Sequence, residues 1–257
     1  QTIAGYICTT FKYDKTGILK WTKDYTPSYW CIGKDIICDD SGNVYVANSS
    51  SVIKYNNSGL LMWEYNDTTD YGKIILDSNV NLYCGGSKSG KFVATKLNIF
   101  GQRLWRTQQF GSDRFKDMVL DKSGSVSITG VAQSGTTFYD YYTIKYSNDG
   151  IILWRKAYSG RAVYPSDDFV YSIASDNMNN VYVTGSSMDS LSTFNCLTVK
   201  YDSFGNEVWI KRIYPPSNGY DIKVDEFQNV YIAARSNGNN YAIKMDMNAN
   251  IIWQRTY

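Results

Sequence analysis

Histidine is absent from this chain of 257 residues. Without an imidazole, the Ser-His-Asp and Cys-His forms of nucleophilic catalysis are excluded, and so are zinc sites that depend on histidine. The sequence also has no glycine-rich phosphate loop leading from a strand into a helix. We therefore expect a protein that is not an enzyme and that holds no metal and no cofactor.

An excess of charge and a long apolar run are missing as well. Lys and Arg number 26 against 24 Asp and Glu, which gives a formal net charge of +2. Recognition of a phosphate backbone or an anionic membrane needs concentrated positive charge, so nucleic acid is not an expected partner. No run of about 18 apolar residues occurs, and no membrane span is predicted.

Proline is scarce, at 4 residues, whereas the chain contains 23 Tyr and 7 Trp. Tyr, Trp, Val, Ile and Thr favour the pleated, half-buried surface of a sheet. Gly, Asn, Asp and Ser recur at short intervals, as turns require. No amphipathic helix of convincing length is present, so the composition predicts an all-β fold.

Six copies of one Lys–Trp pair divide the chain, and in each pair the Trp follows the Lys by nine positions. A turn signal that ends in Gly or Asn lies between the two residues. Six identical spacings in one chain are far outside chance and identify an internal repeat. The pairs are Lys12 and Trp21, Lys54 and Trp63, Lys96 and Trp105, Lys145 and Trp154, Lys200 and Trp209, and Lys244 and Trp253.

A second block precedes five of these pairs and reads as an apolar strand, an Asp, a turn and another strand. Six positions after the Asp stands a Tyr, except in the fourth copy, which has Ser127. Each full repeat therefore holds four short strands, A to D, at about 35–39, 43–48, 51–55 and 60–65 in the second copy. The Asp and its partner are Asp39 and Tyr45, Asp77 and Tyr83, Asp121 and Ser127, Asp176 and Tyr182, and Asp225 and Tyr231.

One small sheet cannot bury both of its faces alone, so units of this kind stack radially as blades. The sequence thus predicts a single domain over residues 1–257, a six-bladed β-propeller of four-stranded antiparallel blades. The repeats span approximately residues 1–25, 35–65, 73–110, 116–158, 170–214 and 220–257.

Three segments carry a family resemblance: residues 143–146 (TIKY), 198–201 (TVKY) and 180–186 (NVYVTGS). They resemble the bacterial β-propeller repeats known as SBBP, which occur in secreted and surface proteins. The resemblance covers essentially the whole chain and is specific for the fold, but it brings no catalytic residues with it. It implies an extracellular or cell-surface location.

The first repeat is incomplete. Its B motif is recognisable from about residues 1–5 and no A strand precedes it, so the first blade lacks its own inner strand. Three explanations are open: the chain is part of a longer one that closes the ring, blade one has three strands, or another molecule donates the strand by β-augmentation. In the third case the unpaired edge would template self-association into a filament or a surface scaffold.

The connections within a repeat differ in how constant they are. The A–B and C–D turns keep one length. The distance from the Asp to the next Lys, which includes the B–C loop, is 15, 19, 24, 24 and 19 residues, and the distance from the Trp to the next Asp, which includes the D–A loop, is 18, 14, 16, 22 and 16 residues. In an antiparallel blade the variable B–C and D–A loops emerge on one face, here called the variable-loop face. Variable loops usually carry function, so we expect a ligand site there.

Aromatic rings together with Asp, Asn and Arg are what a sugar or peptide site uses, and the variable loops contain many of them. The competing interpretation is ordinary solvated loop residues, with Tyr packing over the blade ends. The candidate ligand-binding residues are Tyr29, Trp30, Asp35, Asp70, Tyr71, Lys73, Asp113, Arg114, Asp117, Tyr142, Arg161, Tyr164, Asp167, Asp168, Tyr220 and Asp221, with Tyr139 and Asn218 in the same loops.

Five residues share one register, four positions before each strand-A Asp. They could line a channel mouth and hold a cation, because hard metals prefer carboxylate oxygens, or they could simply face water. The repeated Lys sits mid-strand, so a stem packed on an aromatic ring is its expected role. The five residues are Asp35, Lys73, Asp117, Ser172 and Asp221.

Three functional hypotheses follow. The first is a non-catalytic extracellular binding module that takes a protein or a glycan on the variable-loop face. The second is a structural subunit that self-assembles through the missing strand, and the third is a carbohydrate-active enzyme that pairs Asp167 with Asp117. The five Cys include no CxxC pair, and whether Cys31 approaches Cys8 or Cys38 stays open.

Overall fold

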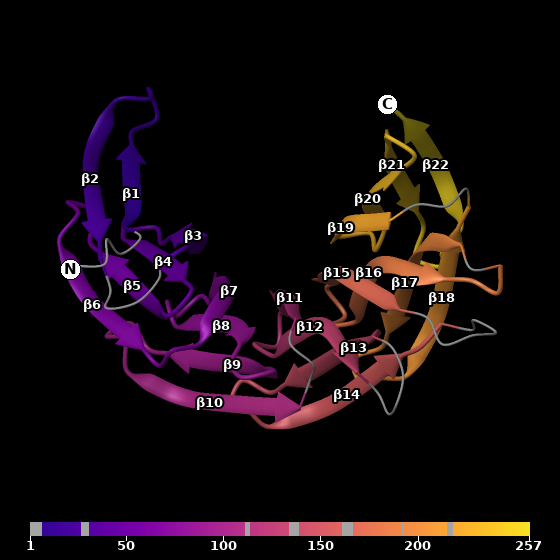
Figure 1. Cartoon of the computed structure of the whole chain (residues 1–257), viewed down its shortest axis with the longest axis horizontal. Helices are drawn as coiled ribbons and strands as arrows, with labels where there is room; N and C mark the ends of the chain where they lie inside the picture. Colours follow the sequence, from indigo (N-terminus) through magenta and orange to yellow (C-terminus); the bar gives the residue numbers. More distant parts are fainter. Residues whose placement is uncertain are drawn as a thin grey trace, which may run out of the picture. The chain divides into compact units, whose positions relative to one another are not determined.

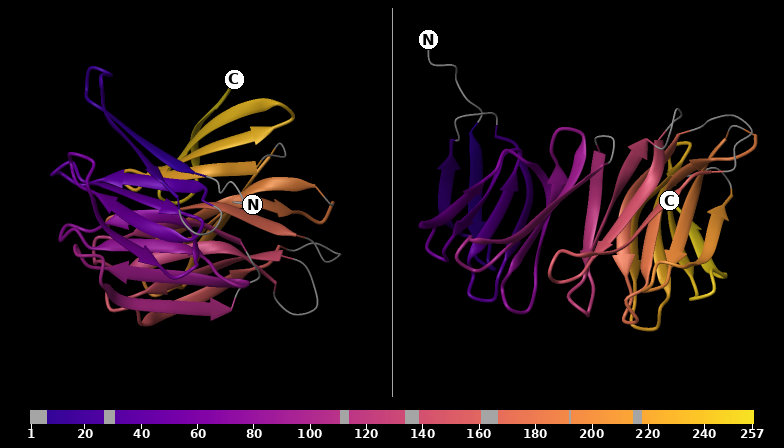
Figure 2. Two further views of the ribbon diagram at one scale, coloured as in Figure 1. Left: turned by 60° about the vertical axis from the view of Figure 1, so that its left-hand side comes forward. Right: turned by 90° about the horizontal axis from the view of Figure 1, so that it is seen from below.

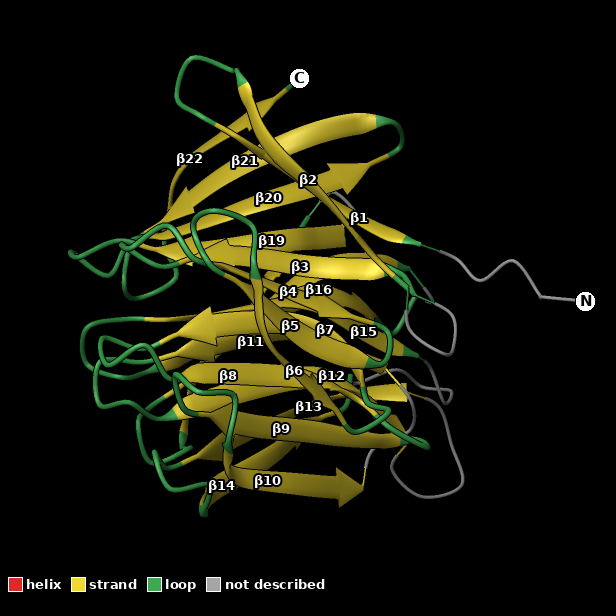
Figure 3. Ribbon diagram, turned by 90° about the vertical axis from the view of Figure 1, so that its left-hand side faces the viewer, coloured by secondary structure: helices red, strands yellow, loops and turns green. Residues whose placement is uncertain are grey.

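The computed structural model describes residues 7–26, 31–110, 114–133, 139–160, 167–191, 193–214 and 218–257. These residues form 22 strands and no helix, as Figure 3 shows by its colours. None of the described residues therefore lies in a helix that could cross a membrane. The expectation of an all-β chain is confirmed.

The strands form one two-stranded sheet and five four-stranded sheets, all antiparallel and each ordered as in the sequence (Figures 1 and 2). In the second repeat the observed strands lie within two residues of the predicted ones. The bounds are β1 Cys8–Tyr13 and β2 Leu19–Tyr25; β3 Gly33–Cys38, β4 Val44–Asn48, β5 Ser51–Tyr55 and β6 Leu61–Asn66; β7 Asp70–Leu76, β8 Leu82–Ser87, β9 Lys91–Leu97 and β10 Arg103–Phe110; β11 Arg114–Leu120, β12 Val126–Gln133, β13 Tyr139–Tyr146 and β14 Ile152–Tyr158; β15 Asp168–Ser175, β16 Val181–Met188, β17 Phe194–Tyr201 and β18 Glu207–Ile213; and β19 Asn218–Val224, β20 Val230–Ser236, β21 Asn239–Met245 and β22 Ile251–Thr256.

The chain divides into two compact units. The first comprises Gln1–Ser89 and Val93–Gln108, and the second comprises Gly90–Phe92 and Gln109–Tyr257. Within each unit the core lies between the faces of successive sheets. In the first unit Tyr45 and Val52 of the second repeat pack with Ile74 and Leu82 of the third, all at most 2% exposed. Clusters of the same kind join β11–β14 to β15–β18 and β15–β18 to β19–β22 in the second unit.

The repeated Lys–Trp pair turns out to be a direct cross-strand pair. Lys54 faces Trp63 across β5 and β6, and the Tyr of the repeat, Tyr45, faces Lys54 across β4 and β5. The Lys54 ammonium lies 4.8 Å from the centre of the Tyr45 ring. The repeated Lys thus lies over an aromatic ring, and it is more enclosed than an ordinary surface Lys, since Lys54 is only 6% exposed.

This Tyr–Lys–Trp arrangement, which we call the ladder, recurs. Lys96 lies 4.7 Å from the Tyr83 ring centre, and the corresponding distances for Lys200 over Tyr182 and Lys244 over Tyr231 are both 5.0 Å. The indole nitrogen of the ladder also joins successive repeats, because it donates to a turn carbonyl of the next one. The observed bonds are Trp21 to Asn57 O, Trp63 to Ile99 O, Trp154 to Ser203 O and Trp209 to Met247 O, all at 3.0–3.1 Å.

In the fourth repeat a different side chain pairs with the Asp that opens the A–B turn. In the second, fifth and sixth repeats the Tyr hydroxyl donates to the Asp that opens the A–B turn, for example Tyr182 to Asp176 at 2.9 Å. Ser127 is too short to do so, and Lys145 instead pairs with Asp121 at 2.7 Å, with both side chains 2% exposed. A buried ion pair therefore takes the place of a Tyr–Asp hydrogen bond.

The described part of the first repeat is the hairpin β1–β2. The B strand expected at residues 1–5 lies outside the described residues. Phe11 and Tyr13 of β1 are 53% and 55% exposed, whereas their counterparts Ile53 and Tyr55 in the second repeat are 0% and 3% exposed. The first repeat thus carries aromatic side chains at positions that are buried elsewhere in the chain.

Candidate functional site

The antiparallel strand order places the B–C and D–A connections of each sheet at one end and the A–B and C–D turns at the other. The variable-loop face therefore consists of the ends of strands such as β14, β16 and β18 and the connections that follow them. Five candidates from these loops, Tyr29, Trp30, Asp113, Arg161 and Tyr164, lie outside the described residues.

The five residues that share one register all follow a β-bulge in strand A. The register shifts lie between Gly33 and Asp35, Tyr71 and Lys73, Phe115 and Asp117, Val170 and Ser172, and Gly219 and Asp221. The common position predicted from spacing is thus a common backbone feature, because a bulge re-aims the side chain that follows it.

These bulge side chains mostly bond to backbone amides. The carboxylates of Asp35, Asp117 and Asp221 each accept the N–H of the next residue, at 2.9–3.0 Å. Where the position is not acidic, the preceding repeat supplies the carboxylate: Ile74 N donates to Asp35 at 2.9 Å. Lys73 lies 3.8 Å from the same Asp35 carboxylate.

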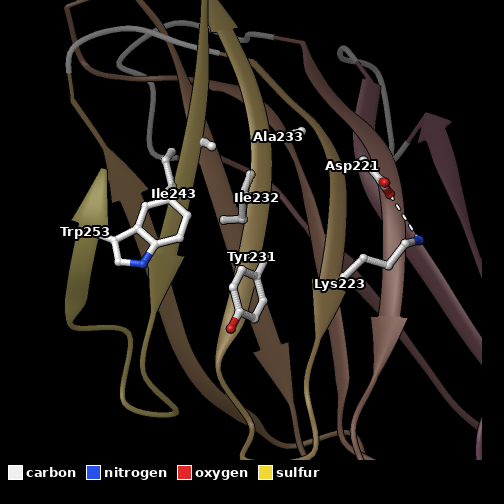
Figure 4. A pocket seen from close by; sticks show the side chains of 8 residues that line it. Asp221, Lys223, Tyr231, Ile232, Ala233, Ile243 and Trp253 are labelled. Atoms are coloured by element: carbon white, nitrogen blue, oxygen red, sulfur yellow. Dashed lines mark hydrogen bonds and ion pairs between the residues drawn. The ribbon is translucent and has the colours of Figure 1, made fainter. Parts of the chain in front are cut away.

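In the second unit the bulge position of the fifth repeat bridges two acids. The Ser172 hydroxyl lies 2.8 Å from Asp117 Oδ2 and 3.0 Å from Asp221 Oδ1. Ile173 N also donates to Asp117, and Lys223 pairs with Asp221 at 3.3 Å, the dashed line in Figure 4. Among the described residues, no group of three or more acidic or Cys side chains could hold a metal ion. The partners observed for Asp35, Asp117 and Asp221 are backbone amides and neighbouring side chains.

Two candidates are fully buried within their sheets. Strand β7 begins at Asp70 and β15 begins at Asp168, so these A strands start earlier than the spacing predicted. Tyr71 is 0% exposed and its hydroxyl lies 3.1 Å from the Thr95 hydroxyl. Asp168 is also 0% exposed and accepts the N–H of Gly160 at 2.5 Å, and burial raises the pKa of its carboxyl. Neither side chain is available to a ligand in this arrangement.

Other candidates do meet at the variable-loop face of the second unit. The Arg114 guanidinium lies 5.6 Å from the Tyr139 ring centre, and Asp167 accepts the N–H of Tyr139 at 3.0 Å. Tyr142 stacks on Phe92 at 6.0 Å, and Tyr220 lies 5.2 Å from Tyr171. Asp117 and Asp167 have separate partners, and in the first unit Asp70 pairs with Lys34 at 3.5 Å.

A pocket of about 380 Å³ opens where three variable connections of the second unit converge. We call it the Arg212 pocket, because Arg212 on β18 is the only cationic side chain among the described residues that line it. Both terminal nitrogens of Arg212 are anchored: Nη1 donates to Ser187 O at 2.7 Å and Nη2 to Ser187 Oγ at 3.0 Å. The lining residues are Tyr158, Ser159, Asp189, Ser190, Leu197, Ile210, Arg212 and Tyr214.

The side chains around Arg212 divide into fixed and open ones. Asp189 forms a turn: its Oδ1 accepts the N–H groups of Leu191 and Thr193, and its Oδ2 accepts the Asn195 amide. The backbone bond from Thr193 is the main reason that the pKa of the Asp189 carboxyl is below its usual value. Burial raises the pKa of Tyr158, whereas Tyr214 is 61% exposed at the rim.

None of the Arg212 pocket residues was among the sequence candidates. A signal was present, however. The fifth repeat has an Asp-to-Lys distance of 24 residues, which only the fourth equals, and the Trp-to-Asp distance that leads into it is the longest, at 22 residues. Long B–C and D–A loops at one place leave room for a pocket between them. The candidates were taken from D–A loops and strand starts, whereas Arg212 and Tyr214 end a D strand.

A second, smaller hollow of about 210 Å³ lies on the face of the last sheet. Figure 4 shows Tyr231 and Ala233 on β20 and Trp253 on β22, with the Lys223–Asp221 pair at the edge of the hollow. The rings of Tyr231 and Trp253 lie 6.4 Å apart. The hollow is therefore the surface of a ladder and belongs to the repeat architecture.

Comparison with known proteins supports the architecture. Residues 216–242 match the family described as SBBP, Beta-propeller repeat. The chain carries an SBBP beta-propeller repeat. None of the curated proteins matches the chain.

Solved structures extend the likeness beyond the matched SBBP repeat. Virginiamycin B lyase from Staphylococcus aureus has a TM-score of 0.60 at 10% identity, over 96% of this chain and 76% of that one. BamB from Moraxella catarrhalis has a TM-score of 0.57 at 14% identity, over 97% and 70%. The extracellular domain of a one-component system from B. thetaiotaomicron has a TM-score of 0.53 at 15% identity, over 86% and 27%. At such identities the likeness shows the fold alone, a β-propeller. The six repeats of the chain fit six blades, and the described part of the first blade has two strands.

Proposed function

We propose that this chain is a non-catalytic binding module outside the cell, and that the Arg212 pocket takes a small hydroxyl-rich group such as one sugar residue of a glycan. The observation that carries the proposal is the convergence of three variable connections on one pocket of about 380 Å³ with an anchored cation. Ligand sites are concave, largely preformed and lined by apolar surface with a few fixed polar groups.

The lining has the chemistry that a sugar needs. Tyr158 and Tyr214 offer ring faces for the apolar side of a pyranose, and Leu197 and Ile210 supply the apolar wall. The Arg212 guanidinium is held by Ser187 and presents a rigid fork of donors, which is suited to hydroxyl and carboxylate oxygens. Ser159 and Ser190 add exposed hydroxyl groups at the rim.

The carboxylates near the pocket support binding rather than catalysis. Both Asp189 oxygens are engaged by the turn that they stabilise. Asp168 is fully buried. Glycoside hydrolysis needs two carboxyl groups that face the scissile bond from opposite sides, and neither of these is free to do so.

The location proposed for this module is the cell exterior or the cell surface. The SBBP repeat over residues 216–242 supports it, as does the fold likeness to an extracellular domain.

A glycan array followed by calorimetry on the strongest hit tests the proposed function. Arg212→Ala and Tyr214→Ala should each weaken binding at least about tenfold, the loss of roughly one good polar or aromatic contact. Arg155→Ala is the matched control, because Arg155 is an exposed Arg on β14, next to the pocket but not in its lining. Equal affinity in all three variants, or no bound glycan at all, would contradict the proposal.

A second candidate function is self-assembly through the first repeat, in which β1 accepts a strand from a second copy of this chain. Among the described strands β1 pairs only with β2. A groove of about 310 Å³ runs beside it, lined by Thr10 and Phe11 of β1 and by Asp35 and Ile36 of β3. A strand edge beside an apolar groove is the geometry that β-augmentation uses.

Sedimentation velocity across a wide range of protein concentration tests this second function. Assembly should grow with concentration and should be lost in Phe11→Lys, which places a charge in the groove. Phe204→Lys is the matched control, since Phe204 is 81% exposed in a turn of another repeat. A monomer at every concentration, or equal loss of assembly in both variants, would contradict strand exchange.

A further inference from the structure

The five cysteines are all thiols in the structure, and two of them lie together. Cys8 is the first residue of β1, and Cys31 precedes β3 by two residues. Both belong to one apolar cluster with Tyr25, Val44 and Ile53, and they are 8% and 3% exposed. The two thiols are within hydrogen-bonding reach of each other.

The Cys8 sulfur lies close to the backbone two residues after Cys31. A Cβ placed on Gly33 would meet the Cys8 sulfur at 3.3 Å, so that sulfur lies directly against the segment that begins at Cys31. Disulfides need Cα atoms within about 7 Å of each other. The position of the Cys8 sulfur beside Gly33 is compatible with that limit.

The other cysteines have no such neighbour among the described residues. Cys84 and Cys196 are buried in different clusters. Cys38 ends β3 and lies about 16 Å along the strand from Gly33, at roughly 3.3 Å per residue, too far from Cys31 for a bridge. Of the two pairings that the sequence left open, the structure supports Cys8 with Cys31.

We propose that Cys8 and Cys31 form a disulfide bond when the chain folds in an oxidising compartment. The oxidant is a disulfide-bearing thiol reagent such as oxidised glutathione or an oxidised dithiol protein. Two exchange steps form the Cys8–Cys31 S–S bond, break the S–S bond of the reagent and release two reduced thiols that carry the two protons. Such a bridge fits the location proposed above but does not depend on the Arg212 pocket.

The bridge would fasten the first hairpin to the second repeat. In the structure that hairpin is held by noncovalent contacts, such as Trp21 to Asn57 O and Lys12 to Gly42 O. The hairpin also carries the exposed side chains of Phe11 and Tyr13. A covalent link from the start of β1 to the start of β3 would keep the hairpin in place even when these contacts open.

Burial decides when the bridge can form. The thiolate is the attacking species, and burial raises the pKa of Cys31 to about 12, so the folded reduced chain holds very little of it near neutral pH. Oxidation is therefore expected during folding, before β1 packs, and slow in the folded chain.

Alkylation and mass spectrometry of the full chain test the proposal. The chain is refolded with oxidised and reduced glutathione, denatured and treated with iodoacetamide. The reduced chain should take up five alkyl groups, one for each Cys, and the oxidised chain three. Trypsin should then release residues 1–12 joined to residues 24–34, a pair that reduction separates, because Lys12 and Lys23 lie between the two Cys.

Two variants show whether the loss of alkyl groups comes from Cys8 and Cys31. Cys8→Ser should take up four alkyl groups with or without oxidant, whereas Cys38→Ser should take up four when reduced and two when oxidised. Hydrogen exchange gives a second readout: amides of β1 and β2 should exchange about a hundredfold more slowly in the oxidised chain, the scale expected for closing a loop of this length. Five alkyl groups after oxidative refolding, a linked peptide that contains Cys38, or glutathione attached to Cys8 or Cys31 would each overturn the proposal.

Discussion

Replacement of Asp121 by Asn should destabilise the chain more than the same change at any exposed turn. Asp121 is the acceptor for the Lys145 ammonium at 2.7 Å, and both side chains are 2% exposed. Asp121 Oδ1 also accepts the N–H groups of Ser123 and Ser125, and Asn keeps an oxygen for both. The substitution therefore leaves the turn intact and removes only the negative charge beside a buried ammonium.

The expected magnitude follows from that uncompensated charge. Breaking a buried pair by removing one partner costs about 3–5 kcal/mol, whereas replacing both partners with neutral groups is often close to neutral. Lys145 keeps one bond, to Asn179 O at 2.8 Å, so we expect the lower end, about 3 kcal/mol. Asp121→Asn combined with Lys145→Met should recover about 2 kcal/mol of that loss, because no buried charge is then left alone.

Urea unfolding followed by Trp fluorescence measures these differences, since Trp154 is the cross-strand partner of Lys145. Asp225→Asn is the control, because Asp225 opens the same kind of turn but receives the Tyr231 hydroxyl instead of an ammonium, and it should cost less than about 1 kcal/mol. The reasoning would be refuted if Asp121→Asn unfolds within about 1 kcal/mol of the parent chain, or if the double variant is less stable than the single one.

Three further outcomes are expected. Gly185→Ala should lower the free energy of unfolding by at least about 3 kcal/mol, because the new Cβ would lie 2.0 Å from the Phe169 carbonyl oxygen. Gly17→Ala should cost only about 1 kcal/mol, since Gly17 has open space around it and a φ of 83°, and thermal unfolding of both variants measures the difference. The melting temperature should fall between about pH 4 and 2. Hydrogen bonds from Thr16 lower the pKa of Asp14 to about 2 and those from Asn250 lower the pKa of Asp246, so the contribution of both carboxylates is present above the unfolded value of 3.8 and is lost as they take up protons. An Asp246→Asn chain that shows the same acid profile in full would speak against a share for Asp246. Alkylation of Cys31 in the folded, reduced chain should accelerate about tenfold per pH unit between pH 7 and 9, since its pKa is about 12 and only the thiolate reacts, and a rate that levels off in this range would contradict the raised pKa.

The repeat spacing predicted much of the fold because each spacing corresponds to one cross-strand contact. Nine residues from Lys54 to Trp63 span a strand end, a tight turn and a strand start, and this places the two side chains opposite each other. Six residues from Asp39 to Tyr45 likewise return the Tyr hydroxyl to the Asp that opens the turn, at 3.1 Å. Turns of constant length leave little freedom, so sequence distance translates directly into register.

The candidate site was less predictable, because it depends on where strands begin and end. Tyr71 and Asp168 lie in sequence where loops were expected, yet β7 begins three residues and β15 two residues earlier than predicted, and this buries both side chains. The Arg212 pocket depends on three connections that approach one another, and no single segment contains that information. Element boundaries are set by tertiary packing as well as by local preference.

The bulge position in strand A restricts how such a chain can change through evolution or design. In the second repeat Asp35 serves its own neighbour Ile36 and also the amide of Ile74, whose own repeat has Lys73 at that position. In the fourth repeat Asp117 does the same for Met118 and for Ile173, which follows Ser172. Deleting or reordering a repeat would leave the backbone amide of the following repeat without its carboxylate acceptor, so these repeats are not interchangeable. A bulge position that loses its acid needs an acid at the bulge position of the repeat before it.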